Sequence, residues 1–322
     1  MAEGGEAFRL DRAQLRASFD RASASYESAS GLQTRVAAEL LERLAAFDFL
    51  PAVVLDLGAG TGRLTRELKR RYRRALVIAL DLSPGMLREA RRHQLPWRRF
   101  ERVCGDALRL PLADASVDVV FSSLMLQWCE PLSAALAEVR RVLEPDGFFA
   151  FSTFGPDTLN ELRSAWASAD GYNHVNGFID MHDVGDALVQ AGLTEPVLDV
   201  DRIAVDYADV LALMRDLKAI GAHNVTAGRP RALTGRARFT RMQQAYEAFR
   251  RDGGLPATYE IIYGASWGAA GRRAAAAVGG EARIAPGSIP IPVSLMSIRI
   301  HCPSFCVRAV MVPPSGVNLI AF

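Results

Sequence analysis

Short, continuously hydrophobic runs alternate with helical patterns through the middle of the chain. Five such runs, rich in β-branched and aromatic residues, cover residues 52–57, 75–80, 100–104, 117–122 and 148–154. Helical patterns that begin near residues 62, 84 and 132 separate most of them. Strands that alternate with helices pair in parallel and are covered on both faces, which explains why they are hydrophobic throughout. The pattern predicts an α/β fold with a doubly wound, mostly parallel sheet.

Helical patterns also precede and follow this central region. Residues 11–47 carry hydrophobic side chains at helical spacing, interrupted by Ser and Gly, which predicts two helices before the first strand. Two later segments, 196–205 and 258–263, have extended patterns, and about fifty residues (206–256) separate them. A hairpin needs far fewer. Further helical patterns cover residues 157–167, 181–191, 208–220 and 236–250. We therefore expect a helical lid inserted before the last strand.

These patterns divide the chain into three expected parts. Residues 1–50 are predicted to form an N-terminal helical lid, and residues 51–268 the α/β domain with its insertion. After residue 268 the composition changes to an Ala- and Gly-rich stretch followed by six prolines, with a single acidic residue. Repeated prolines break regular structure. We expect residues 269–322 to form a poorly ordered extension without a catalytic role, and a docking tail is the alternative.

The composition is that of an ordinary soluble globular protein. The 322 residues are 50% hydrophobic and 23% charged, with a formal charge of +2. A near-neutral chain disfavours nucleic-acid binding. No hydrophobic run approaches the length of about 18 residues that a membrane span needs, and residues 1–11 lack the features of a signal peptide or presequence. The four cysteines form no CxxC pair. We expect a cytoplasmic monomer with no metal and no membrane or nucleic-acid partner.

The most informative motif is VLDLGAGTG at residues 54–62. Its three glycines follow a predicted strand, and glycine allows a tight turn and a close approach to a ligand. The spacing differs from the dinucleotide fingerprint, because Arg63 or Thr65 stands where the third glycine of that fingerprint belongs. A phosphate-binding P-loop needs Lys after its last glycine, and Arg63 follows Gly62. The motif therefore disfavours phosphate binding.

An acidic residue stands at the end of each of the first three predicted strands. These residues are Asp56, Asp81 and Asp106. Ligands of open α/β sheets bind where the carboxyl ends of the strands meet, so the three carboxylates should converge there. Asp81 could accept hydrogen bonds from the two hydroxyls of a ribose. Each aspartate taken alone could equally be a helix cap or a turn former, but together with the glycines they indicate one binding site.

The pattern Asp56-x-Gly58-x-Gly60-x-Gly62 resembles motif I of the class I S-adenosylmethionine-dependent methyltransferases. The resemblance implies a seven-stranded, Rossmann-like sheet and S-adenosylmethionine as the cofactor. It implies that Asp106 lies beside the adenine amino group and Gln127 near the methionine moiety. Met86 would flank the ribose or adenine, although a core position is nearly as plausible. The cofactor-binding residues implied are Asp56, Gly58, Ala59, Gly60, Gly62, Asp81, Leu82, Met86, Asp106, Ala107 and Gln127.

Further motifs resemble a narrower family, and this resemblance covers most of residues 15–268. They are FDRA at 19–22 with Tyr26, LQ at 32–33, LQWC at 126–129, FSTFGPDTL at 151–159, FIDMHD at 178–183 and TYEIIYG at 258–264. Together they look like the malonyl-acyl-carrier-protein O-methyltransferase family of biotin synthesis. The segment after about residue 280 departs from that family's pattern.

The resemblance implies transfer of a methyl group from S-adenosylmethionine to the free carboxylate of malonyl-acyl-carrier protein. That carboxylate is already ionised near pH 7, so we nominate no catalytic base. Tyr26 could close over the methyl group and the carboxylate, and His182 could hydrogen-bond substrate, with a purely structural role as the alternative for each. Acyl carrier proteins are acidic, and a cluster of cations could steer one to the lid, or could simply be a solvated helix start. This cluster is Arg229, Arg231, Arg236, Arg238 and Arg241.

Three other functions remain open at this point. Related methyltransferases act on the carbons of quinones, and a mitochondrial subgroup is associated with respiratory complex I assembly and arginine hydroxylation. A protein of this fold could also bind the cofactor and act as a scaffold without turnover. A scaffold would bind S-adenosylmethionine but move no methyl group, which separates it from the enzymes.

Overall fold

The computed structural model describes residues 10–44, 50–222, 224 and 235–268 of the chain. The expected C-terminal extension, together with Arg229 and Arg231, lies outside these residues.

Seven strands form one sheet in the order β3-β2-β1-β4-β5-β7-β6. β7 runs antiparallel to both of its neighbours, and the other pairs are parallel. The predicted α/β fold with a mostly parallel sheet is confirmed. The strands are β1 (Val53–Leu57), β2 (Leu76–Asp81), β3 (Glu101–Cys104), β4 (Val117–Ser123), β5 (Leu143–Phe154), β6 (Thr194–Tyr207) and β7 (Leu255–Trp267).

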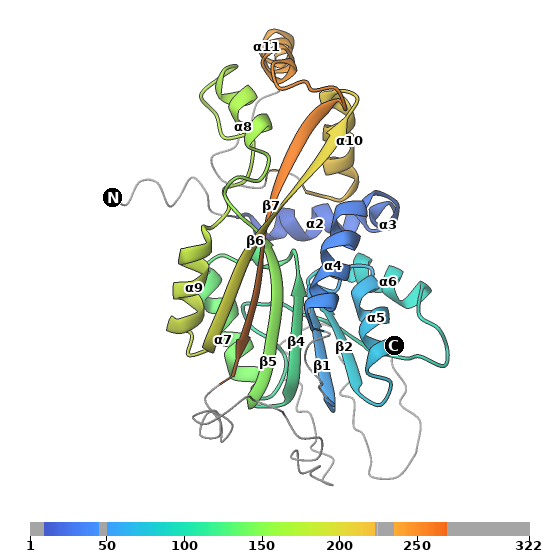
Figure 1. Ribbon diagram of the computed structural model, residues 1–322. Helices are drawn as coiled ribbons and strands as arrows, with labels where there is room; N and C mark the ends of the chain where they lie inside the picture. The colour runs from blue at the N-terminus through green and yellow to red at the C-terminus, as the bar shows by residue number, and fades with distance from the viewer. Residues whose placement is uncertain (1–9, 45–49, 223, 225–234, 269–322) are drawn as a thin grey trace.

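Helices connect the parallel strands and precede the first of them (Figure 1). The connecting helices are α5 (Arg63–Arg71), α6 (Pro84–Arg92), α7 (Leu132–Val142), α8 (Asn160–Ala167) and α9 (Met181–Gln190), with a 3₁₀ turn η2 (Leu126–Trp128) after β4. Among residues 10–44 and 50–52, three helices precede β1 where the sequence predicts two: α2 (Arg12–Ala22), α3 (Tyr26–Ala29) and α4 (Gly31–Arg43). The one-turn helix α3 is too short to produce a periodic pattern.

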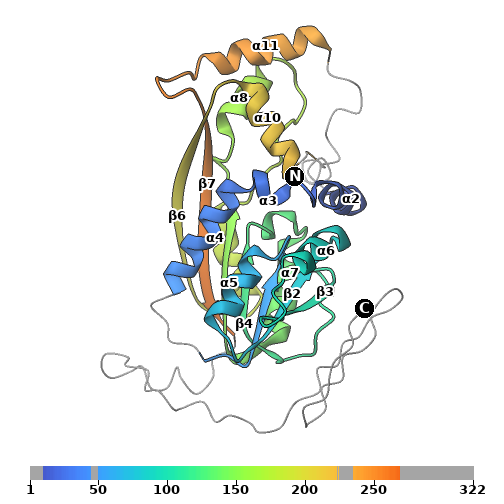
Figure 2. The ribbon, with the colours of Figure 1, turned by 90° about the vertical axis from the view of Figure 1, so that its right-hand side faces the viewer.

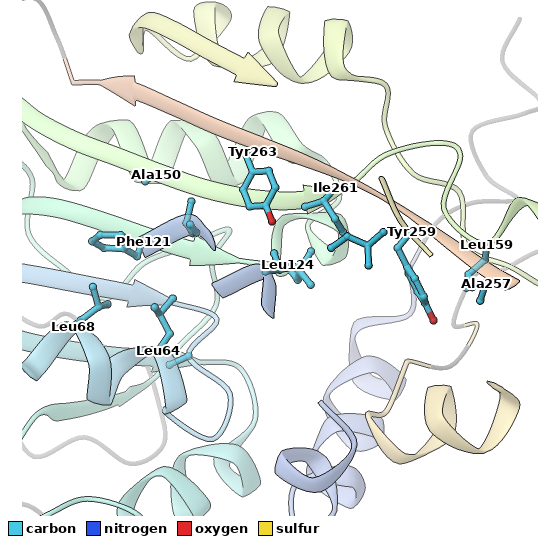
Figure 3. Close-up of a cluster of buried hydrophobic side chains, with 14 of the residues drawn as sticks. Leu64, Leu68, Phe121, Leu124, Ala150, Leu159, Ala257, Tyr259, Ile261 and Tyr263 are labelled. Atoms are coloured by element: carbon cyan, nitrogen blue, oxygen red, sulfur yellow. The ribbon is translucent and has the colours of Figure 1, made fainter. Parts of the chain in front are cut away.

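Side chains from both faces of the sheet are buried. Successive residues of β2 alternate between two hydrophobic clusters: Val77 and Ala79 belong to one, and Ile78 and Leu80 belong to the other. This alternation follows from the two-residue period of a strand, and it requires helices on both faces. Figure 3 shows Ala257, Tyr259, Ile261 and Tyr263 following one another along β7, in the first of these clusters.

β6 and β7 extend beyond the other strands and carry a group of helices at their far end (Figure 2). Two of these helices, α10 (Val210–Ala219) and α11 (Arg236–Glu247), lie between β6 and β7 in the chain. α11 packs against α8, and the Tyr246 hydroxyl donates to the Pro256 carbonyl at 2.8 Å. The buried carboxylate of Glu161 on α8 accepts from the Thr258 amide at 3.1 Å. These bonds attach the helices to β7.

Two of the motifs quoted above meet at the end of β5. The buried carboxylate of Glu260 accepts from the Asp157 amide at 2.8 Å, and the Glu260 carbonyl accepts from the Gly155 amide at 2.9 Å and from the Thr158 hydroxyl at 3.1 Å. A Cβ on Gly155 would lie 2.5 Å from the Glu260 carboxylate, so a larger residue there would displace that carboxylate. Segments 151–159 and 258–264 therefore hold each other in place.

Candidate active site

The glycine turn after β1 has a conformation that other residues rarely adopt. Gly58, Gly60 and Gly62 have φ values of 81°, 54° and 75°. A Cβ on Gly58 would lie 2.2 Å from Cγ of Met125. The amides of Gly58 and Ala59 donate to the Leu80 carbonyl at 2.8 and 3.0 Å. The turn is thus fixed against the end of β2 and against the segment that follows β4.

Asp81 holds the glycine turn on the side where a ligand would bind. One carboxylate oxygen accepts from the Gly60 amide and the other from the Ser83 amide, both at 2.8 Å. Each oxygen keeps a further lone pair, so the group can still accept two hydrogen bonds. Removal from water raises the pKa of Asp81 to about 6.

Asp56 has a different environment, although it ends the neighbouring strand. Its side chain is buried and accepts from the Thr65 hydroxyl at 2.5 Å. Burial raises the pKa of Asp56 to about 7. This carboxyl therefore links β1 to α5 through its hydrogen bond with Thr65.

The N-terminal helices cover the glycine turn. One oxygen of Asp20 on α2 accepts from the Ser83 hydroxyl at 2.6 Å and from the Gly85 amide at 2.7 Å, at the start of α6. Figure 2 shows α2 beside α6. Tyr26 lies so close to the turn that a Cβ on Gly60 would be 3.9 Å from its ring. Burial, followed by the charge of Asp81, raises the pKa of Tyr26 to about 12, so its hydroxyl stays protonated.

The same helices reach the ends of β3 and β4. Arg12 on α2 forms an ion pair with Asp106, and Phe19 packs edge-on against Trp128 with ring centroids 5.5 Å apart. At the other end of the site, Ser18 and Ser25 donate to the Gly221 and Ala219 carbonyls at the end of α10, at 3.1 and 3.0 Å. α2 therefore contacts both the sheet edge and the helices on β6 and β7.

Gln127 is fixed at the end of β4. Its Nε2 donates to the Leu124 carbonyl at 2.6 Å, and its Oε1 accepts from the Thr153 hydroxyl at 3.2 Å. Two other residues predicted to bind the cofactor are buried: Met86 is 1% exposed and Ala107 is 8% exposed. Leu82, which is also predicted to bind it, is half-buried.

The residues predicted for substrate and carrier differ widely in environment. The His182 side chain is 86% exposed and bonds to Asp180 at the start of α9, at 2.8 Å. Arg241 donates to the Ala169 carbonyl at 3.0 Å. Arg238 lies 5.8 Å from the ring centroid of Tyr172, and the side chain of Arg236 is exposed. Tyr26 is also predicted to contact the substrate. Among the predicted substrate and carrier residues that the structure describes, Tyr26 alone lies against the glycine turn.

Sequence reasoning missed three residues that complete this arrangement: Arg12, Asp20 and Thr153. Asp20 belongs to the FDRA motif, and Thr153 to the motif at 151–159, which begins in β5, so a signal existed for both. No pattern marked Arg12, because its partner Asp106 lies far away in the chain.

Comparisons with known proteins identify the family. Residues 55–151 match a family model described as a methyltransferase domain. A malonyl-acyl-carrier protein O-methyltransferase from Laribacter hongkongensis is 53% identical over 275 residues, which cover 83% of this chain and 93% of the relative. One with the same name from Methylovorus is 50% identical over 268 residues, 81% of this chain and 90% of the relative.

Solved structures support the fold alone. A chain of the complex between the Haloferax volcanii Trm112 methyltransferase activator and a proposed methyltransferase matches with a TM-score of 0.50 at 21% identity, covering 78% of this chain and 98% of that one. The fold is that of the class I methyltransferases, and the sequence identity over nearly whole relatives shows that the chain belongs to the malonyl-acyl-carrier protein O-methyltransferase family.

Proposed function

We propose that the protein transfers a methyl group from S-adenosylmethionine to the free carboxylate of malonyl-acyl-carrier protein, as in the priming of biotin synthesis. The observation that carries this proposal is the 53% identity to a relative of that name, over 93% of the relative's length. The motifs outside the cofactor site also support it. Quinone methylation, arginine hydroxylation and a scaffold role have no comparable support.

The residues at the sheet edge fit the cofactor. The free lone pairs of Asp81 can accept from the ribose hydroxyls, and the glycine turn leaves room above Gly60, where a Cβ would meet no atom nearer than 3.9 Å. Asp106 would receive the adenine amino group, and the segment that contains Met125, which packs on Gly58, would lie near the methionine moiety. When bound, S-adenosylmethionine supplies an electrophilic methyl group whose bond to sulfur breaks as its bond to the carboxylate oxygen forms.

The protein's contribution to the reaction is position and exclusion of water. A malonyl carboxylate is ionised near pH 7, so no residue needs to remove a proton. The reaction cancels an anion against a cation, and a dry site removes hydration that would hold them apart. Holding the reacting atoms in line can supply about 7–11 kcal/mol of the barrier. Tyr26 and the helices over the glycine turn serve this purpose, with the Tyr26 hydroxyl as a neutral donor.

The partner and the setting follow from the same proposal. An acidic carrier would be attracted to the cations on α11, where the Arg236 side chain is exposed, and its association should weaken as salt rises. Within the residues that the structure describes, no helix is both long and apolar enough to cross a membrane. We also infer that the protein acts as a cytoplasmic monomer.

A labelling assay tests the proposed function. Purified protein is incubated with methyl-labelled S-adenosylmethionine and, separately, with malonyl-, succinyl- and acetyl-carrier protein. We expect base-labile label on the malonyl carrier and none on the acetyl carrier, which has no free carboxylate. A protein that binds S-adenosylmethionine in calorimetry but labels none of the three carriers would contradict the proposal and favour the scaffold.

The pH dependence of cofactor binding should report on Asp81. The ribose hydroxyls need the ionised carboxylate as acceptor, and its pKa is raised to about 6. Below that pH the carboxyl protonates, so the Kd for S-adenosylmethionine should rise as pH falls, by up to about tenfold per pH unit. Calorimetric titrations from pH 8 to pH 5 would measure this. Asp81→Asn should bind S-adenosylmethionine weakly at every pH, with a Kd that does not depend on pH. A wild-type Kd that stays constant from pH 8 to pH 5 would contradict the role of Asp81 in binding the ribose.

A further inference from the structure

A small pocket opens beside Gln127, at the ends of β4 and β5. Its walls are the apolar side chains of Leu126, Leu132, Phe178, Ile179 and Val184. Gln127 and Thr153 are the only polar side chains among the lining residues that the structure describes. Val184 and Leu126 are almost fully buried, whereas Ile179 is 38% exposed at the edge of the pocket. The pocket is therefore apolar, with a single polar corner.

The amide of Gln127 has one orientation. The Leu124 carbonyl can only accept, so the atom 2.6 Å from it must be Nε2, and the Thr153 hydroxyl then donates to Oε1. Leu124 itself has a φ of 50°, a conformation that non-glycine residues rarely adopt and that recurs at functional sites. Nε2 carries a second N–H, which has no partner among the described residues.

This pocket adjoins the glycine turn. Met125 lies between Leu124 and Gln127 in the chain, and its side chain packs directly on Gly58. The pocket and the turn thus share one short segment, residues 124–127. A group held at Gln127 would lie next to whatever binds over Gly58 and Gly60.

We propose that this pocket binds the malonyl group and that the free N–H of Gln127 donates to the malonyl carboxylate, with Thr153 as the positioning residue that fixes the amide. The proposal rests on the proposed function and names the acyl subsite within it. Gln127 is thereby assigned to the acceptor, whereas the family resemblance implies a place near the cofactor.

A neutral donor suits the reaction better than a cation at this position. A guanidinium would stabilise the carboxylate in the ground state, and that stabilisation would be lost as the carboxylate becomes a neutral ester. One amide N–H makes a single hydrogen bond to the carboxylate, whereas a charged guanidinium can make two in parallel, so the amide orients the carboxylate and binds it less tightly. The apolar walls exclude water from the reacting oxygen.

Two variants test the polar corner. Gln127→Met keeps the length of the side chain but removes the donor, and Thr153→Val keeps the shape of Thr153 but releases the amide. We expect the KM for malonyl-carrier protein to rise about 10- to 100-fold in Gln127→Met and by less in Thr153→Val. The Kd for S-adenosylmethionine, measured by calorimetry on the same proteins, should stay within about twofold.

The outcomes separate the two proposals. A Kd for S-adenosylmethionine that rises as much as the KM would place Gln127 in the cofactor site and overturn the acyl pocket. If the wild type is active and the KM is unchanged in both variants, the acyl pocket is contradicted and the proposed function is not. A wild type that binds S-adenosylmethionine but does not methylate malonyl-carrier protein would overturn the proposed function, and the pocket with it.

Acyl selectivity gives a second test that a structural role would not affect. Ile179→Ala should enlarge the pocket at its exposed edge and raise the rate on succinyl- relative to malonyl-carrier protein about 10-fold or more. Leu95→Ala is the matched control, because Leu95 is 44% exposed, loses the same number of carbons and lies beyond α6. It should leave the ratio unchanged. An equal ratio in Ile179→Ala, Leu95→Ala and the wild type would contradict the proposal.

Discussion

Replacing Asp81 with alanine is expected to raise the Kd for S-adenosylmethionine by about 100-fold or more. Two hydroxyl groups that donate to a carboxylate contribute about 1.5–3 kcal/mol each, and each 1.4 kcal/mol corresponds to a factor of ten in Kd. The variant also frees the amides of Gly60 and Ser83, which Asp81 holds at 2.8 Å. Isothermal titration calorimetry at pH 8 measures the loss, and circular dichroism checks that the protein is folded.

Asp118 offers a matched control for this substitution. Its carboxylate also accepts hydrogen bonds from two backbone amides, those of Ala52 and Val53, at 2.9 and 2.7 Å. These bonds lie where β1 and β4 begin, at the opposite end of the strands from Asp81. Asp118→Ala should lower the free energy of unfolding and leave the Kd near the wild-type value. Equal cofactor affinity in Asp81→Ala and Asp118→Ala would show that Asp81 does not bind the ribose.

Gly58→Ala is expected to lower the free energy of unfolding by about 2–5 kcal/mol. A left-handed conformation costs a non-glycine residue about 1–2 kcal/mol, and the new Cβ would lie 2.2 Å from Cγ of Met125. Overpacking of this kind adds about 1–3 kcal/mol. Denaturation by urea, with and without S-adenosylmethionine, would measure both the stability and the loss of stabilisation by the cofactor.

Gly31→Ala is the control for the glycine substitution. Gly31 begins α4, and a Cβ there would meet no atom within 4 Å. Because alanine favours a helix over glycine by about 0.5–1 kcal/mol, this variant should be as stable as the wild type or slightly more stable. A Gly58→Ala protein as stable as Gly31→Ala would contradict the strained geometry of the turn.

The strands could be predicted where burial dominates the sequence, and less well where it does not. β1, β2 and β4 lie within one or two residues of the predicted runs because both of their faces are covered. β5 begins at Leu143, five residues before the predicted run at 148. Its first part contains Glu144, Pro145 and Asp146, which are exposed and have no hydrophobic pattern. Exposed ends of strands carry no hydrophobic pattern by which the sequence could predict them.

The site could be predicted in part. Local sequence indicates glycines and aspartates at strand ends, because the chain must turn there. It does not indicate that Arg12 meets Asp106 or that Thr153 fixes Gln127, since these pairs form only when distant segments pack. Nor does it separate Asp56, which is buried against Thr65, from Asp81.

α2 is attached to two other parts of the fold through residues that lie only two positions apart in the helix. Asp20 ties the helix to Ser83 and Gly85 at the sheet edge, while Ser18 ties it to Gly221 after α10. A rigid displacement of α2 away from α6 would break the bonds of Asp20 and, unless α10 moved with the helix, the bond from Ser18 to Gly221 as well.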